Sequence, residues 1–370
     1  MSFKDKLLTH SNSYNFYKKE YKKLTEKTKQ QKQNINQLKQ ENKQQKQNIN
    51  QLKQDLHYLN KNKICKKIRN NNFSELTIAI KSPHTNKRWG DYFFALSLQK
   101  SLKKKGFNVI IQGHENWYST EDKEDIVIVL RGLEEYNPSY KHLNLMWNIS
   151  HPNLISKEEN EKYDIVFIAS EKYANKVSKD VNTLVKPLIQ CTDLEVFYPK
   201  IDNELKNDLL FVGNTRGVYR EIIKDVMNTK HEVSIYGLGW KEFIDEKYIK
   251  GEFIENNQLN KYYSSCKILL NDHWKDMVEK EFTSNRLFDA LACGTFIISD
   301  KMSTTEHLLK GSVVTYENSE DLDEKINYYL NHPEERQKLA KKGQEEVLKN
   351  HTFDNRVNTI IETLKELDYK

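Results

Sequence analysis

The sequence has few of the residues that cross-link or break a chain: 4 cysteines, 6 prolines and 12 glycines among 370 residues. The cysteines show no CxxC spacing and no disulfide framework, and most have apolar neighbours; they are Cys65, Cys191, Cys266 and Cys293. We therefore expect reduced thiols in the core of a cytoplasmic protein.

Long apolar runs and an excess of one charge are missing as well. No run approaches 18 apolar residues, and the segment from Met1 to Lys6 has no apolar signal-peptide region, so we expect neither a membrane span nor a signal peptide. The 59 basic and 53 acidic residues leave a net charge of only +6, which requires no nucleic-acid partner, and we predict none. The mild basicity still suits peripheral association with the anionic inner face of a membrane.

What the sequence does have near its start is a heptad repeat. Residues 30–43 are followed by a near copy at 44–57, and no glycine or proline interrupts the pattern. Position a holds Tyr14, Tyr21, Thr28, Ile35, Asn42, Ile49 and Leu56, and position d holds Tyr17, Leu24, Gln31, Leu38, Gln45, Leu52 and Leu59. Ile at a, Leu at d and one Asn at a favour a parallel two-stranded coiled coil, with a trimer as the alternative. We predict that residues 1–66 join copies of the chain in this way; a solvated single helix or a disordered polar leader is the other interpretation.

Short apolar runs without alternation follow, separated by helical stretches. They lie at 76–80, 109–111, 126–130, 143–147 and 165–169, and then at 209–212, 233–236, 268–270, 296–298 and 313–316. Such runs are typical of parallel strands that are covered on both faces. We therefore predict an α/β fold in which two Rossmann-like, doubly wound domains face each other across a cleft.

The domain boundaries follow from these runs. The first domain is expected over residues 74–190 and the second over 205–352, with the proline-containing segment 186–206 as the link. Two amphipathic helices are expected at the end of the chain, at about 320–349 and 353–368. We assign 353–370 to a C-terminal helix that packs back toward the first domain.

One stretch, residues 284–294 (SNRLFDALACG), combines three signals. Its apolar residues fall on one face of a helix, Gly294 is a natural end for that helix, and a β-branched strand follows at once. The helix N-terminus offers unpaired N–H groups, Arg286 adds donors suited to phosphate, and Asp289 is placed one turn on to accept from sugar hydroxyls. The stretch indicates a pocket for a diphosphate sugar; an ordinary helix-strand unit with surface charges is the alternative.

These residues resemble a known family. The segments Asn271 to Trp274 and Ser284 to Gly294 closely resemble the C-terminal domain of bacterial GT-B glycosyltransferases related to the spore-maturation CgeB type. Further matches run from Trp89 to Asp91, Trp147 to Pro152, Leu188 to Asp193, Phe211 to Gly217 and His351 to Phe353. The resemblance covers about residues 76–365 and leaves out the heptad repeat.

The resemblance implies transfer of a sugar from a nucleotide donor, held mainly by the second domain, to an acceptor held mainly by the first. We expect that acceptor to be a surface glycan or a protein. Such folds generally work without a metal, so we expect no cofactor, and protein cations and helix N-termini must balance the diphosphate charge. Arg286 is the first candidate for that task. Arg216 is the second, with Asn214, in a glycine-bounded loop whose other interpretation is a simple tight turn.

Further donor-binding residues are expected from the same resemblance. His273 follows a strand at the cleft and is expected to bond the diphosphate or the sugar, unless it is a satisfied loop residue. Tyr236 and Gly237 stand where the nucleobase lies in such folds, although the glycine is equally compatible with a turn. The remaining donor-binding candidates are Asp272, Ser284 and Asn285.

Catalytic carboxylates and bases are expected on both sides of the cleft. In many retaining GT-B enzymes two acidic residues separated by seven others contact the donor, and Glu281 and Asp289 have that separation. Asp289 is a methylene shorter than the usual residue, and Glu281 is otherwise explained as a solvent-facing side chain. An inverting enzyme instead needs a base near the acceptor hydroxyl, for which Asp91 and His151 are candidates; Asp91 is otherwise explained as a helix N-cap. The cleft-end residue Arg131 is a candidate for binding an acidic acceptor.

Two other functions stay open on the sequence alone. One is a non-catalytic GT-B-like scaffold that binds a glycan or a partner enzyme and is assembled by its coiled coil. The other is an epimerase or phosphorylase on the same two-domain fold. The polar residues at the cleft favour the glycosyltransferase.

Overall fold

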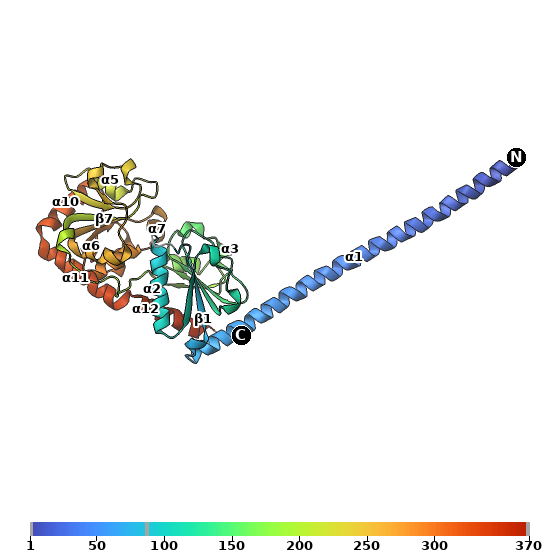
Figure 1. Cartoon of the computed structure of the whole chain (residues 1–370), viewed down its shortest axis with the longest axis horizontal. Helices are drawn as coiled ribbons and strands as arrows, with labels where there is room; N and C mark the ends of the chain where they lie inside the picture. The colour runs from blue at the N-terminus through green and yellow to red at the C-terminus, as the bar shows by residue number, and fades with distance from the viewer. Residues whose placement is uncertain (1–2, 86–88, 368–370) are drawn as a thin grey trace. The chain divides into compact units, whose positions relative to one another are not determined.

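The computed structural model describes residues 3–85 and 89–367, and the side chains from residue 14 onward (Figure 1). The chain divides into two units, an N-terminal helical segment that ends at Leu59 and a larger body that begins at Asn60. In the part of the chain so described, no helix is both long and apolar enough to cross a membrane.

Helix α1 (Phe3–Arg69) is a single helix of 67 residues, so the predicted helix is confirmed. Its apolar heptad side chains are 47 to 75% exposed within one chain; they are Tyr14, Tyr17, Tyr21, Leu24, Ile35, Leu38, Ile49, Leu52, Leu56 and Leu59. An apolar seam that is open to water adds no packing energy to the helix, and a partner along that seam would stabilise it. Whether a second chain supplies that partner stays a prediction.

The last turns of α1 belong to the body. Ile64, Cys65 and Ile68 are buried in the core of the first domain, and Lys61 forms an ion pair with Asp164. Residues 60–69 are therefore part of the folded first domain rather than of the free helix.

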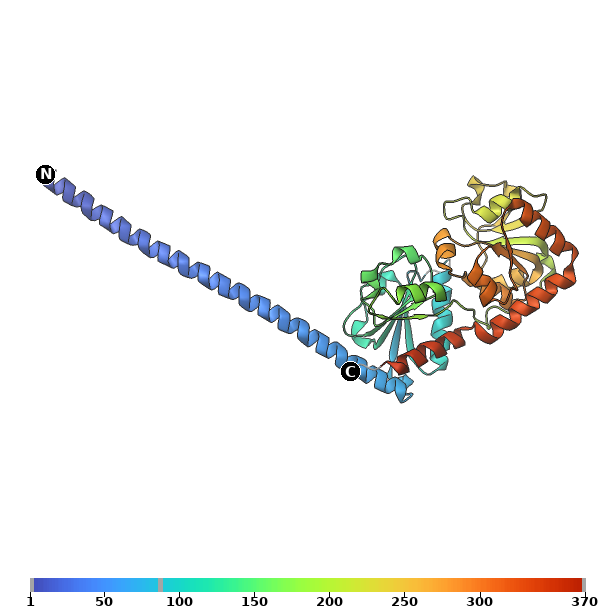
Figure 2. The ribbon, with the colours of Figure 1, turned by 180° about the vertical axis from the view of Figure 1, so that it is seen from behind.

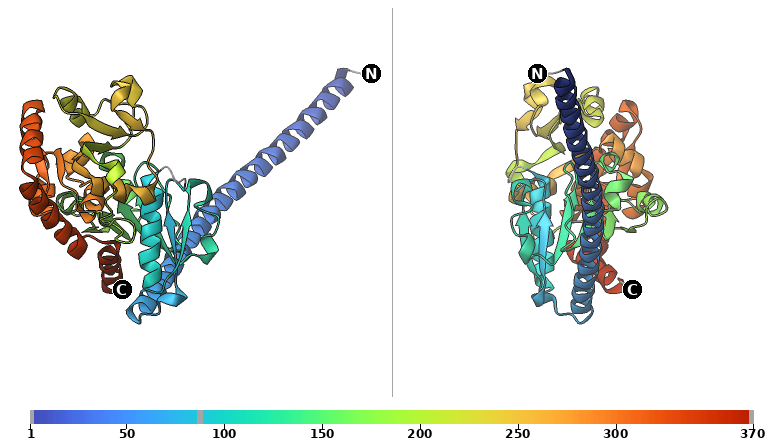
Figure 3. Two further views of the ribbon diagram at one scale, coloured as in Figure 1. Left: turned by 60° about the vertical axis from the view of Figure 1, so that its left-hand side comes forward. Right: turned by 90° about the vertical axis from the view of Figure 1, so that its right-hand side faces the viewer.

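The first domain holds a six-stranded parallel sheet in the order β2-β1-β3-β4-β5-β6. Its strands are β1 (Thr77–Lys81), β2 (Asn108–Gln112), β3 (Ile126–Arg131), β4 (Leu143–Asn148), β5 (Ile165–Ile168) and β6 (Leu184–Pro187). Its helices are α2 (Gly90–Lys104), α3 (Lys157–Asn160) and α4 (Glu171–Val177), with short 3-10 turns at Phe73–Glu75, His114–Asn116, Glu121–Lys123 and Pro152–Leu154. Figure 3 shows α2 in cyan beside these strands.

The second domain repeats this architecture in the order β12-β11-β10-β7-β8-β9, again all parallel. Its strands are β7 (Asn207–Val212), β8 (Val233–Tyr236), β9 (Ile249–Gly251), β10 (Cys266–Asn271), β11 (Ile297–Asp300) and β12 (Val314–Tyr316). Its helices are α5 (Glu221–Met227), α6 (Leu259–Ser265), α7 (Lys275–Lys280), α8 (Asn285–Ala292), α9 (Ser303–Leu308), α10 (Ser319–Asn331) and α11 (Pro333–Asn350), with 3-10 turns at Asn203–Leu205, Trp240–Glu242, Glu246–Tyr248 and Asn256–Gln258. The predicted fold class, two doubly wound domains after a long helix, is confirmed.

The structure differs from the sequence prediction in two strands that were not predicted and in one predicted helix that is divided in two. Strands β6 and β9 lie at sheet edges and are partly exposed, so they lack the buried apolar run that marked the other strands. The single helix expected at about 320–349 is two helices, because Pro333 starts α11 and cannot continue the hydrogen bonding of α10.

The chain crosses from the second domain back to the first at its end. Helix α12 (Phe353–Glu366) buries Phe353, Val357, Ile360 and Leu364 in the core of the first domain. Figure 2 shows this crossing from behind, with α11 on the second domain and α12 on the first. Arg356 fixes the crossing by donating to the carbonyl oxygens of residues 189 and 190 in the other interdomain segment.

A polar cleft between the two domains

A cleft of about 860 Å³ opens between the domains at the carboxyl ends of their strands. Every predicted site residue except Glu281 and Arg131 lines it: Asp91, His151, Asn214, Arg216, Tyr236, Gly237, Asp272, His273, Ser284, Asn285, Arg286 and Asp289. These residues follow β1, β4, β7, β8 and β10 or lie on α8. Parallel strands bring their carboxyl ends to one edge of a sheet, which is why loops so far apart in sequence meet here.

Two guanidinium groups approach each other at the floor of the cleft. A Cβ atom on Gly213 would lie 2.9 Å from Nη1 of Arg220 and 3.0 Å from Nη2 of Arg286, so a larger residue there would displace the two guanidinium groups. Arg286 donates from Nη1 to Oδ1 of Asn271 at 2.7 Å. Desolvation and the positive charge of Arg220 both lower the pKa of Arg286.

Arg220, which sequence reasoning missed, is neutralised by Asp272. Its Nε lies 3.1 Å from Oδ2 of Asp272, and a second nitrogen contacts Oδ1. Both side chains are buried. The carboxylate predicted to bind the donor is thus engaged with an arginine, and its direct effect is to hold Arg220 beside Arg286.

Arg216 lies at the mouth of the cleft with its guanidinium 4.4 Å from the ring centre of Trp274. Its backbone has φ 61°, a left-handed conformation that costs energy for a side chain of this size. Among the residues described here, neither Arg216 nor Arg286 forms an ion pair. The cleft therefore contains two cationic side chains that no carboxylate of the described residues contacts.

The N-terminus of α8 opens on the same floor. Ser284 is the N-cap residue, but its side chain makes no capping hydrogen bond. Asn285 donates from Nδ2 to Oδ2 of Asp289 at 2.8 Å. Leu287 and Phe288 are buried, which fixes the helix by the apolar face that the sequence indicated. The first-turn N–H groups and Arg286 are consequently presented together.

Asp289 connects this helix to the segment between the domains. Its Oδ1 accepts a hydrogen bond of 2.7 Å from Oγ1 of Thr192. Burial raises the pKa of Asp289 to about 7, against the effect of the Thr192 and Asn285 hydrogen bonds. Burial thus favours the neutral form of the carboxyl group that was expected to bind a sugar.

His273 contributes to the cleft with its backbone, because its side chain is fully buried. Its Nδ1 lies 2.6 Å from Oδ1 of Asp300, and its backbone N–H donates to Oδ2 at 2.9 Å. Within the described chain its Nε2 has no hydrogen-bond partner. The imidazole is thus directed toward Asp300. In the sequence analysis Asp300 has no predicted role, although this residue ends β11, the strand that follows α8.

The loops after β7 and β8 form the wall expected to meet the nucleobase. Oδ1 of Asn214 accepts from the backbone N–H of Leu238 at 2.9 Å, which joins the two loops. A Cβ atom on Gly237 would lie 2.1 Å from the carbonyl oxygen of Gly213, so a side chain has no space there. Tyr236 packs edge-on against Tyr262. Gly237 is required by the close approach of the loops, whether or not a ligand contacts it.

The first domain provides two titratable groups on the opposite side. Asp91 is not the N-cap of α2, since that position is held by Trp89, and the capping explanation is wrong. Burial raises the pKa of Asp91, opposed by the charges of His84 and Arg216. His151 adopts φ 51°, and its ring centre lies 5.6 Å from that of Trp274.

Burial also lowers the pKa of His151, although Asp276, whose Oδ2 lies 3.9 Å from Nδ1, opposes this effect. Both first-domain groups are therefore shifted toward their neutral forms. A carboxyl group and an imidazole in that condition suit exchange of a proton with a hydroxyl group near neutral pH.

The structure does not bring Glu281 and Arg131 into the cleft. Glu281 ends α7 with φ 60° and contacts Nζ of Lys172 at 2.6 Å and Oγ of Ser303 at 3.0 Å. Arg131 is buried, and its Nε lies 2.6 Å from Oε1 of Glu159. Arg131 is thus unavailable to an acceptor, and that expectation is wrong.

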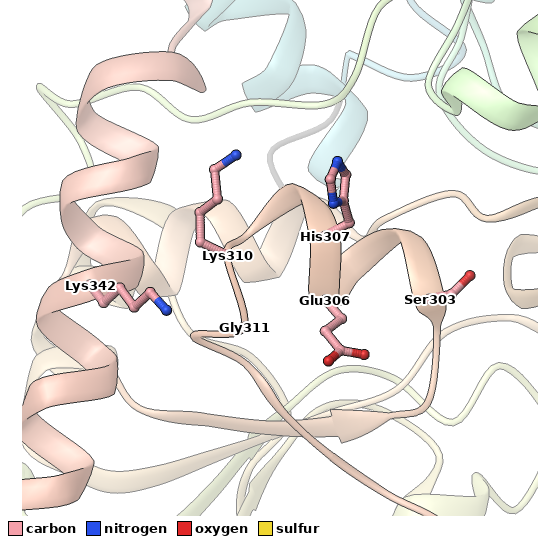
Figure 4. A pocket seen from close by; sticks show the side chains of 6 residues that line it. All are labelled: Ser303, Glu306, His307, Lys310, Gly311 and Lys342. Carbon is pink, nitrogen blue, oxygen red and sulfur yellow. The ribbon is translucent and has the colours of Figure 1, made fainter.

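A second hollow lies on the second domain, lined by Ser303, Glu306, His307, Lys310, Gly311 and Lys342. Figure 4 shows that Glu306 points away from His307 and Lys310, so the charged groups do not converge. Over the described residues, no three or more His, Cys, Asp or Glu side chains are grouped to hold a metal ion.

The chain is similar to known proteins in sequence and in fold. Residues 216–362 match the protein family described as glycosyl transferase-like. Over 169 residues the chain is 25% identical to the spore protein CgeB of Bacillus subtilis (strain 168), covering 41% of this chain and 52% of that relative. The match thus spans about half the length of the relative.

Three solved structures share the fold over 79% of this chain. They are sucrose-phosphate synthase from Thermosynechococcus elongatus (TM-score 0.58, 13% identity, 98% of that chain), HepE of Anabaena in complex with UDP-glucose (0.57, 12%, 100%) and an alpha-glucosyltransferase in complex with UDP and a 13-mer DNA (0.58, 12%, 100%). At these identities the likeness shows the fold alone.

The fold and the cleft define the class: the chain has the GT-B fold, two Rossmann-like domains around a polar cleft. Its second domain matches the glycosyl transferase-like family, and the resemblance that the sequence motifs predicted is confirmed.

Proposed function

We propose that this chain transfers a sugar from a nucleotide-diphosphate donor to a surface glycan or a protein. The observation that carries the proposal is the pair of guanidinium groups of Arg216 and Arg286, which line the cleft without a contacting carboxylate in the described chain. Cations held in a partly desolvated cleft are unfavourable unless an anion balances them. The N-terminus of α8 beside Arg286 favours the same occupant.

The proposed donor lies along the second domain. Its nucleobase contacts the wall formed by Tyr236 and Gly237, and its diphosphate lies over Asn285 and Arg286, with Arg216 closing over it. The sugar then points toward the first domain, where Asp91 and His151 are the candidates for the base that accepts the proton of the acceptor hydroxyl.

We propose further that the reaction needs no metal, because two arginines and the α8 N-terminus supply the positive charge that the leaving diphosphate requires. Turnover unchanged in excess EDTA is the expected result. Loss of turnover in EDTA that returns with Mg²⁺ or Mn²⁺ would contradict it.

The test of the whole proposal uses the full chain and a panel of UDP-, GDP-, ADP- and dTDP-sugars. Calorimetry measures binding, and chromatography measures slow donor hydrolysis without an acceptor. We expect one nucleotide class to bind and turn over. Binding without turnover under any condition favours the scaffold, and an isomerised or phosphorolysed sugar favours the epimerase or phosphorylase.

Self-association through α1 is a separate proposal, supported by the exposed heptad seam. Heptad position e is lysine at Lys18, Lys32, Lys39, Lys46 and Lys53. An antiparallel pair would set these lysines against each other, whereas a parallel pair sets them against position g, which includes Glu41. We therefore propose a parallel dimer in a cytoplasmic protein that has no nucleic-acid partner and associates at most peripherally with a membrane.

A further inference from the structure

Beneath the cleft floor a chain of hydrogen bonds joins two strands of the second domain. Nη1 of Arg286 donates to Oδ1 of Asn271 at 2.7 Å, and Nδ2 of Asn271 donates to Oγ of Ser299 at 2.9 Å. Ser299 in turn donates to Oδ1 of Asp300 at 2.8 Å. Asn271 and Ser299 are paired residues on β10 and β11, and both are fully buried.

The direction of each bond in this chain is determined by chemistry. Arginine only donates, so the amide atom of Asn271 that faces Arg286 must be its oxygen, and its nitrogen must face Ser299. A carboxylate only accepts, so the proton of Ser299 must point to Asp300, which leaves the oxygen of Ser299 free to accept from Asn271. Asp300 therefore determines, through two intermediates, which atom of Asn271 meets the guanidinium group.

Asp300 is held in the ionised form that this role requires. Burial disfavours its carboxylate, but the electrostatic interaction and the two hydrogen bonds with His273, together with the hydrogen bond from Ser299, outweigh burial, and the pKa of Asp300 is lowered. The same contacts fix its orientation, since Oδ2 accepts the backbone N–H of His273 and Oδ1 accepts from Nδ1 of the ring. The series of hydrogen bonds that starts at Arg286 thus ends at a carboxylate whose orientation is fixed.

We infer that Asn271, Ser299 and Asp300 are positioning residues that fix the guanidinium group of Arg286 for the diphosphate of the donor. This inference rests on the proposed function. A donor group held before the ligand arrives loses little freedom on binding and needs no reorganisation when charge develops on the leaving phosphate. In that step the bond between the anomeric carbon and the phosphate oxygen breaks, its electron pair stays on the phosphate, and the acceptor oxygen forms the new bond after giving its proton to the base.

The decisive variant is Ser299→Ala, because it removes the link between Asp300 and Asn271 and leaves the His273–Asp300 contact intact. Ser312→Ala is the matched control, since Ser312 is also fully buried but donates to a backbone carbonyl outside the cleft. Asp300→Asn is the second variant. It keeps the shape of the side chain while removing the pure acceptor that orders the chain of bonds.

Affinity is measured by calorimetry for three probes: the best nucleoside diphosphate of the panel, the matching nucleoside, and inorganic pyrophosphate. We expect both variants to bind the nucleoside diphosphate and pyrophosphate about tenfold more weakly, the loss associated with one charge-assisted hydrogen bond, and to bind the nucleoside as the unchanged chain does. Equal loss for all three probes would indicate a merely structural role and overturn the inference.

The outcome is distinguishable from failure of the proposed function. If the unchanged chain binds nucleoside diphosphate and Arg286→Ala weakens it, but Ser299→Ala and Asp300→Asn do not, the function stands and the inference is overturned. If the unchanged chain binds no nucleoside diphosphate, the proposed function fails and the inference fails with it.

Discussion

Thr192 and Asp289 join the two halves of the body: the hydroxyl of Thr192, in the segment between the domains, donates to the carboxyl group of Asp289 on α8 at 2.7 Å. The backbone of Thr192 also pairs with the second crossing, since its N–H donates to the carbonyl of His351 and its carbonyl accepts from Phe353. The helix expected to hold the diphosphate is thus anchored to one interdomain segment and, through Thr192, to the other. This arrangement connects the protonation state of Asp289 to the stability of the two-domain body.

The first prediction concerns Asp289 and pH. Its pKa is raised from 3.8 to about 7, so the folded chain binds this proton more tightly than the unfolded chain. The stabilisation is complete below pH 4 and is lost as pH rises to 7 and above, by about 4 kcal/mol over that range. In Asp289→Asn this contribution cannot titrate. Urea unfolding at pH 5 and pH 8 should show the variant gaining stability relative to the unchanged chain at pH 8; an equal difference at both pH values would contradict the assignment.

The second prediction concerns the phosphate-binding charge. Arg286→Ala should weaken nucleoside diphosphate binding about a hundredfold, and Arg286→Lys by less, because lysine keeps the charge but cannot also hold the bond to Asn271. The loss should shrink as salt rises. Arg336→Ala serves as the control, since that arginine lies on α11 and donates to a carbonyl in the same domain. Titration calorimetry in 50 and 500 mM salt measures both effects.

The third prediction separates Glu281 from the donor site. Glu281→Gln and Lys172→Ala break the ion pair between the domains, and Lys172 is 73% exposed, so the pair stabilises by less than about 1 kcal/mol. Nucleoside diphosphate affinity and turnover should stay within about twofold. A large fall in turnover in Glu281→Gln with unchanged binding would instead support the catalytic role that its spacing from Asp289 implied.

The fourth prediction concerns Asp91 as the base. Asp91→Asn should lower transfer to the acceptor about 10²- to 10⁴-fold and leave donor affinity within about twofold. Because the pKa of Asp91 is raised, the rate of the unchanged chain should increase as pH rises through that pKa, and this limb should be absent from the variant. Initial rates from pH 5 to 9 measure it. If His151→Asn removes the limb and Asp91→Asn does not, the histidine is the base.

The fifth prediction concerns α1. Leu38→Asp together with Ile49→Asp in the full chain puts charges into two layers of the seam and should convert the dimer to a monomer without loss of donor binding. Lys43→Asp with Gln47→Asp, at outer heptad positions b and f, is the control and should leave the dimer intact. Sedimentation velocity measures both. A monomer in the unchanged chain would end the proposal of self-association.

The strands and their parallel order were predictable where the sequence concentrates its apolar residues. The segment Ile126–Arg131 is buried at every position, and an apolar run without alternation is typical of a strand covered on both faces. The apolar face of α8 was predictable for the same reason, since Leu287 and Phe288 are buried as their spacing indicates. Edge strands such as β9 were missed because burial there is partial.

Predictions from residue spacing were wrong where the backbone turns between the two residues. Seven residues separate Glu281 from Asp289, but Glu281 ends α7 in a left-handed conformation and Asp289 lies within α8, so the two carboxylates face different surroundings. The prediction for Arg131 was wrong because Arg131, at the end of β3, is buried in an ion pair with Glu159 of α3. The chain of bonds from Asp300 to Arg286 gave no sequence signal, since its members come from neighbouring strands that are 28 residues apart at Asn271 and Ser299.

The sequence by itself determined the two doubly wound domains, the long helix with its apolar seam, and the loops that reach the cleft, because apolar periodicity and parallel strand order depend on local patterns. Only the tertiary structure decided which charges meet. It paired Asp272 with Arg220 and turned His273 toward Asp300, while Arg286 kept only an amide oxygen. Charge compensation depends on distances of a few ångström between distant segments, and packing of the two sheets and their crossings sets those distances.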